Sequence, residues 1–132
     1  MKKFLCATLL LFAFHFYSSQ EWELVSESSK GSFYMKKEKI NGYGNPKVWV
    51  KGTLKESYYY EGNKKVTVLN PTMLLLYEFN CSDSSTRLIS NILYDSNGVL
   101  LDSYNNNFSE WENVVPGSVG ESELKFVCKY IQ

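Results

Sequence analysis

The sequence predicts an α+β fold: an antiparallel meander sheet of five to six strands, with a C-terminal helix packed on one face and tied to it by a disulfide. Three observations support this prediction. Short apolar runs alternate with turn residues from residue 22 to residue 104. One helix-periodic segment follows near the C-terminus. Two cysteines, Cys81 and Cys128, remain once an N-terminal export signal is set aside.

That export signal occupies residues 1–20. Two lysines precede the uncharged apolar run 4–14, which is too short to span a bilayer well, and small residues follow it. We expect cleavage near Gln20, which leaves one domain, residues 21–132. An uncleaved N-terminal anchor is the alternative. No lipid anchor is expected, and the predicted locations are the cell surface, the medium or the periplasm.

Removal of the signal changes the inventory of charged and catalytic residues. Without Lys2 and Lys3 the 14 basic residues become 12 against 14 acidic ones, a net charge of −2. That charge is not typical of a protein that binds nucleic acid or an anionic membrane. His15, the single histidine, is removed as well, so a Ser-His-Asp or Cys-His arrangement is excluded. We predict no enzyme, no cofactor and no metal site.

The first strands are short. Residues 22–25 and 32–35 are strand candidates, and the charged continuation 36–39 is compatible with either strand or helix. Residues 47–54 form a clearer strand with Val48 and Val50 on one face. Lys47, Trp49 and Lys51 share the other face. Gly52 suggests a bulge or the close approach of another backbone.

The middle of the chain supplies the core strand and a meander. Residues 73–81 are the most apolar mature strand, with Leu75, Tyr77, Phe79 and Cys81 on one face. Two further strands, 86–95 and 99–104, flank the turn 95–98. In this turn an Asn-Gly pair would supply positive φ angles.

The helix begins where Pro116 and Gly117 end the preceding run. Ser118 is suited to cap it, and Glu121 can complete a capping box. Its apolar face consists of Leu124, Val127, Cys128 and Ile131. Because Cys81 is the only other mature cysteine, we predict a Cys81–Cys128 disulfide; two buried free thiols are the alternative. The acidic pairs Glu110/Glu112 and Glu121/Glu123 are interpreted as solvated side chains.

A candidate binding surface lies in the tyrosine-rich middle of the chain. Tyrosine offers a large contact area at a small entropic cost, and lysine attracts anionic partners. Ordinary sheet packing, with alternate tyrosines in and out, is the alternative interpretation. The candidate residues are Tyr58, Tyr59, Tyr60, Lys51, Lys55, Lys64 and Lys65.

Four motifs resemble the surface-adhesin protein E family of Gram-negative bacteria. They are K-V-W-V-K at 47–51, Y-E-F-N-C at 77–81, I-L-Y-D-S-N-G at 92–98 and W-E-N-V-V-P-G-S-V-G-E at 111–121, which leads to Cys128. The resemblance spans roughly residue 22 to the C-terminus, and the last motif is the most specific part.

This resemblance implies a small antiparallel sheet with a C-terminal helix tied to it by one disulfide. It also implies cell adhesion through host extracellular-matrix or serum proteins, such as vitronectin, laminin and plasminogen. The alternative hypothesis is a periplasmic domain that binds a small ligand or inhibits an enzyme; a deep apolar pocket would favour it. An exposed sheet edge would also allow a homodimer.

Overall fold

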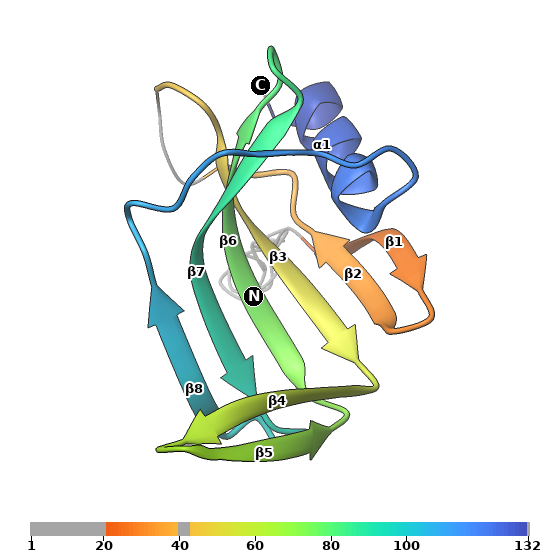
Figure 1. Ribbon diagram of the computed structural model, residues 1–132. Helices are drawn as coiled ribbons and strands as arrows, with labels where there is room; N and C mark the ends of the chain where they lie inside the picture. The colour runs from red at the N-terminus through yellow and green to blue at the C-terminus, as the bar shows by residue number, and fades with distance from the viewer. Residues whose placement is uncertain (1–20, 40–42, 132) are drawn as a thin grey trace, which may run out of the picture.

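The computed structural model describes residues 21–39 and 43–131, so the predicted signal peptide lies outside the described residues. The described chain forms strands and one helix (Figure 1). The strands are β1 (Glu23–Ser28), β2 (Gly31–Met35), β3 (Lys47–Leu54), β4 (Glu56–Glu61), β5 (Lys64–Leu69), β6 (Thr72–Asn80), β7 (Ser85–Tyr94), β8 (Leu100–Asn105) and β9 (Glu112–Asn113). The helix is α1 (Val119–Tyr130).

The main sheet is an antiparallel meander, as predicted. Its strand order is β1-β2-β3-β6-β7-β8, and the short β9 pairs with the start of β7. Strands β4 and β5 pair only with each other, as a separate hairpin inserted between β3 and β6. Backbone hydrogen bonds close the base of the insertion, from Leu54 N to Pro71 O and from Asn70 N to Lys55 O. Figure 1 shows the hairpin lying across one end of the main sheet.

One face of the main sheet forms the core with α1. Buried Val48, Val50 and Phe79 pack with Leu124 and Val127 of the helix. The predicted core faces of residues 47–54 and 73–81 are therefore confirmed. The packing follows from period-two alternation in the strands and from the apolar stripe of the helix, since each buries its apolar side against the other.

The helix begins at the predicted cap. The Ser118 side chain accepts a hydrogen bond from Glu121 N at 3.2 Å. The Glu121 carboxylate reaches back one residue further than in a standard capping box, and accepts from Gly117 N rather than from Ser118 N. The predicted disulfide is present: Cys81 and Cys128 are bonded, with their Cα atoms 5.8 Å apart.

A bulge in β7 breaks the alternation of that strand. Leu76 pairs with Ser90, but its neighbour Tyr77 pairs with Leu88, so Ile89 is an additional residue on β7. Because of this bulge, Leu88, opposite Tyr77, and Ile92, opposite Leu74, lie on different faces of the sheet, although their even spacing in the sequence would place them on one.

Gly52 is not a bulge, contrary to the prediction. It pairs regularly with Phe33 of β2 and Met73 of β6. A Cβ at this position would lie 3.3 Å from the Phe33 ring, so the close approach comes from a side chain rather than a backbone.

Two local expectations also need correction. Strand β2 ends at Met35, and residues 36–39 form neither strand nor helix. In the turn after β7 only Gly98 takes a positive φ, of 81°, whereas Asn97 does not. The Asp95 side chain closes this turn instead, because its Oδ1 accepts from Asn97 N and Val99 N.

Candidate functional site

The outward face of the β4–β5 hairpin is the best-formed part of the predicted binding surface. Pairing of Tyr58 with Thr67 and of Tyr60 with Lys65 places these four side chains on one face. All four are exposed, and Tyr58 and Tyr60 keep 53% and 59% of their accessible area. Leu69, on the same face, is 65% exposed. The hairpin therefore presents aromatic and apolar surface to solvent.

Aromatic contacts order the exposed tyrosines. The Tyr58 and Tyr60 rings meet edge to face, with centroids 5.8 Å apart and an interplanar angle of 87°. The Lys65 ammonium lies 4.0 Å from the centroid of the Tyr58 ring. Both geometries are favourable, because the ring faces carry partial negative charge. The two rings and the ammonium thus form one ordered group, the hairpin cluster (Tyr58, Tyr60 and Lys65).

A groove runs beside the hairpin cluster. Its volume is about 770 Å³, and it lies between the β1–β2 turn and the hairpin. Lys55, the residue that joins β3 to β4, lines it and is exposed. Its lining residues are Ser29, Lys30, Phe33, Leu54, Lys55, Glu56, Ser57, Tyr58, Lys65, Thr67 and Leu69. A groove with apolar walls and three lysines suits an extended segment that carries both apolar and acidic side chains.

Three predicted residues lie elsewhere. Tyr59 points to the opposite face of the hairpin, where its hydroxyl donates to Glu61 at 2.9 Å. This hydrogen bond to a carboxylate raises the pKa of Tyr59. Lys64 is exposed at the hairpin turn, opposite Glu61. Lys51 belongs to the main sheet. The tyrosines therefore alternate between the two faces of the hairpin, as the ordinary packing interpretation expects.

Lys51 belongs to a second group of aromatic and basic residues, the sheet cluster (Trp22, Tyr34, Lys36, Trp49 and Lys51). The Lys51 ammonium lies 5.0 Å from the centroid of the Trp22 ring and 5.2 Å from that of Tyr34. The Lys36 ammonium lies 5.2 Å from the centroid of Trp22. Alternation in residues 47–54 already grouped Trp49 with Lys51, but Tyr34 joins them only through β2–β3 pairing.

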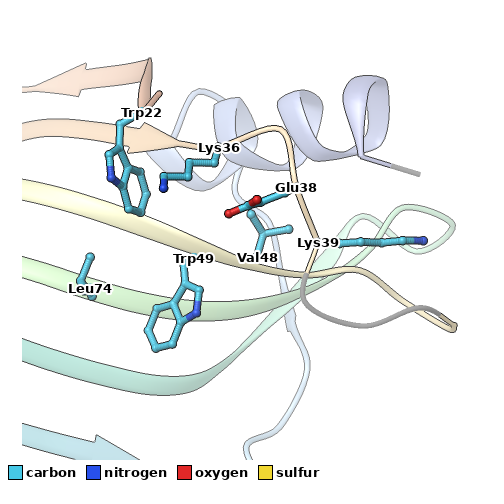
Figure 2. Close-up of a pocket in the computed structure, with 7 residues that line it drawn as sticks. All are labelled: Trp22, Lys36, Glu38, Lys39, Val48, Trp49 and Leu74. Atoms are coloured by element: carbon cyan, nitrogen blue, oxygen red, sulfur yellow. The ribbon is translucent and has the colours of Figure 1, made fainter. Parts of the chain in front are cut away.

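Trp22, Lys36 and Trp49 of the sheet cluster line a hollow of about 360 Å³, whereas Tyr34 and Lys51 lie outside its lining. Figure 2 shows Trp22 and Trp49 on its two sides, with Lys36 extending toward Trp22 and Lys39 pointing away. The lining residues are Trp22, Lys36, Glu38, Lys39, Val48, Trp49 and Leu74. Indole faces and charged side chains thus meet at one concave surface.

Glu123 corrects the interpretation of the acidic pairs. Its side chain is buried, with 6% of the residue exposed, between the helix and the sheet. Burial raises the pKa of Glu123 to about 7. It also lies near enough to Tyr77 to contribute, after burial, to raising the pKa of that phenol to about 12. Glu121 is engaged with Lys125 and the helix cap, whereas Glu110 and Glu112 are exposed as predicted.

Residues 21–39 and 43–131 contain no group of three or more histidine, cysteine, aspartate or glutamate side chains that could hold a metal ion. Over the same residues, no helix is long and apolar enough to cross a membrane. Both cysteines of this part of the chain are in the disulfide.

The family model for surface-adhesin protein E matches residues 22–129, which is nearly all of the described chain. This chain belongs to the surface-adhesin protein E family. No curated protein and no solved structure matches it. Membership of the surface-adhesin protein E family confirms the resemblance that the motifs indicated, and it supports an exported, adhesin-like protein with a binding rather than a catalytic role.

Proposed function

We propose that this member of the surface-adhesin protein E family is a protein-binding module, and that the hairpin cluster with the adjoining groove is its binding surface. The observation that carries the proposal is the exposure of Tyr58 and Tyr60 on a hairpin held outside the main sheet. Tyrosine is enriched among residues that dominate binding energy, because its ring buries much area and loses little rotamer freedom.

The charge at this surface indicates the kind of partner. Lys30, Lys55 and Lys65 line the groove with a single carboxylate, Glu56. A partner segment with acidic side chains would complement these lysines, and rim charges of this kind mainly accelerate association. Host extracellular-matrix and serum proteins, which the family resemblance implies, are the partners to test first: vitronectin, laminin and plasminogen.

The test is surface plasmon resonance of the purified exported protein over these three host proteins. We expect Tyr58→Ala and Tyr60→Ala each to weaken binding by about tenfold or more, as truncation of an aromatic anchor does. Tyr104→Ala is the matched control, because Tyr104 is 56% exposed on β8, outside the hairpin. Equal loss in the control, or no loss in the hairpin variants, would contradict the proposed surface.

Location is tested separately by protease treatment of intact cells with a lysed control. Cleavage in intact cells is the expected result for an adhesin displayed at the surface. Cleavage after lysis alone would place the protein in the periplasm, and host binding would then not be its role.

The small-ligand hypothesis has one observation in its favour. The hollow beside the sheet cluster has a volume of about 360 Å³, within the range of small-molecule sites, although it is flanked by charged side chains rather than being uniformly apolar. A homodimer through a sheet edge stays a prediction, which light scattering after size exclusion tests.

A further inference from the structure

The hollow on the main sheet is lined by two indole rings, against which a ring of similar size in a ligand could pack. Trp22 and Trp49 are half-buried, so each indole keeps part of its surface available to a ligand. Leu74 of β6 adds an aliphatic side chain to the lining of the hollow. A volume of about 360 Å³ lies at the small end of the range for ligand sites. The hollow therefore suits one or two sugar-sized rings of a short ligand, with any further ring outside it, rather than a long peptide.

Two lysines at this hollow, Lys36 in its lining and Lys51 beside Trp22, form no ion pair with the described residues. Lys36 and Lys51 contact Trp22 and Tyr34 by cation–π geometry only. Neither lysine takes part in the ion pairs Lys37–Glu23, Arg87–Glu78 and Lys125–Glu121. Two ammonium groups on neighbouring segments are thus available for a ligand carboxylate, which each can bind as a point charge.

Glu38 narrows the class of ligand. It lines the same hollow, and in Figure 2 its carboxylate lies between Lys36 and Val48. This carboxylate repels the acidic group of any ligand, so a ligand that carries acidic groups alone is disfavoured. Sugar hydroxyls offset the repulsion, because they can donate to a carboxylate while the C–H face of the ring packs on an indole.

We infer that this hollow binds an acidic saccharide. The C–H face of one sugar ring packs against Trp22 and Trp49, the carboxylate of the sugar is bound by Lys36 and Lys51, and a ring hydroxyl donates to Glu38. The site lies on the main sheet and does not depend on the hairpin cluster, so it would add carbohydrate binding to the protein-binding function proposed above.

The test is isothermal titration calorimetry of the purified exported protein with trigalacturonate, and with its methyl ester as a neutral ligand of the same ring structure. We expect trigalacturonate to bind and the ester to bind at least tenfold more weakly. Binding should weaken as salt rises from 0.05 to 0.5 M, because the screening length for exposed charges falls from about 14 Å to about 4 Å over this range.

Substitutions test which residues bind trigalacturonate. Lys36→Gln and Lys51→Gln should each weaken binding by about threefold to fivefold, which is the range of a partly exposed ion pair. Lys64→Gln, at the hairpin turn, and Tyr58→Ala are controls that should leave trigalacturonate affinity unchanged. In nuclear magnetic resonance spectra, the indole N–H signals of Trp22 and Trp49 should shift on titration, whereas that of Trp111, which packs on Arg87, should not.

Four results would overturn the inference. The first is absence of trigalacturonate binding at millimolar concentration. The second is equal affinity for the acid and its ester, and the third is undiminished binding in the double variant K36Q/K51Q. The fourth is equal or tighter binding of hexaglutamate at the same site, which would assign the lysines to acidic protein segments. Absence of host-protein binding by the parent protein would contradict the function proposed above and leave this inference intact.

Discussion

The two faces of the main sheet differ in the side chains that alternation along each strand places on them: one face is apolar and buried, and the other is aromatic and basic. On the face toward α1, Val48, Val50 and Phe79 are fully buried against the helix. On the other face, Trp49 and Lys51 of the same strand take part in the sheet cluster, with rings and ammonium groups in contact. The first face holds the fold together, and the second presents chemistry that could recognise a ligand. The β4–β5 hairpin repeats this division on a smaller scale, with Tyr58 and Tyr60 outward and Tyr59 inward.

The disulfide should give the largest effect on the helix-covered face. Cys81→Ser and Cys128→Ser should each lower the free energy of unfolding by about 4 kcal/mol, the chain-entropy value for the 47-residue separation between the two cysteines. Urea denaturation of each variant measures the loss. Clearly unequal losses, or thiols alkylated in the non-reduced parent protein, would contradict a single shared bond.

Glu123 should make the stability of that same face depend on pH. Burial raises its pKa to about 7 from 4.5, so the folded state retains a proton that the unfolded chain releases. Its contribution is complete below about pH 4.5 and falls as pH rises to about 7. Glu123→Gln should therefore raise the free energy of unfolding at pH 8 by up to about 3 kcal/mol, and change it little at pH 4.

Thermal unfolding across pH 4 to 8 measures the effect of Glu123→Gln. Glu112→Gln is the matched control, because Glu112 is exposed and should leave the profile unchanged. A variant profile parallel to that of the parent protein would show that Glu123 is not the group responsible.

The helix cap should have a smaller effect. Ser118→Ala removes the hydroxyl that accepts from Glu121 N, at a cost of about 1 kcal/mol. Chemical denaturation measures it, and Ser118→Asp, which restores an acceptor at the cap, should recover most of the loss. If Ser118→Asp were as unstable as Ser118→Ala, the hydrogen bond would not be the cause.

The smallest effect on stability is expected in the hairpin cluster. Tyr58→Ala and Tyr60→Ala should change the free energy of unfolding by no more than about 0.5 kcal/mol, because both rings are exposed. Phe79→Ala, on the helix-covered face, should cost about 3–5 kcal/mol. Denaturation of these variants beside one another measures the difference between core and binding surface; a large loss in the hairpin variants would show that the tyrosines serve packing.

The sequence was most informative where the type of a residue and its place in the chain are enough to indicate its role. Ser118 could be identified as a cap, and Cys81 and Cys128 as a pair, without knowledge of any neighbour in space. It was least informative for Glu123, because a charged residue is expected to be exposed to solvent. This side chain is buried where the helix packs on the sheet, and the sequence alone does not reveal that packing. Gly52 was misinterpreted for a similar reason, since the ring that lies against it comes from another strand.

By itself, the sequence determined the antiparallel strands, the capped helix and the disulfide of this protein, because periodicity, cap residues and cysteine count are properties of the chain read in order. Only the tertiary structure decided that β4 and β5 form a hairpin outside the main sheet. It also decided that Lys51 contacts Trp22 and Tyr34 instead of the tyrosines of that hairpin. The physical reason is that these contacts depend on strand pairing between distant segments. Two residues adjacent in sequence can face opposite sides, while residues far apart in sequence meet on one.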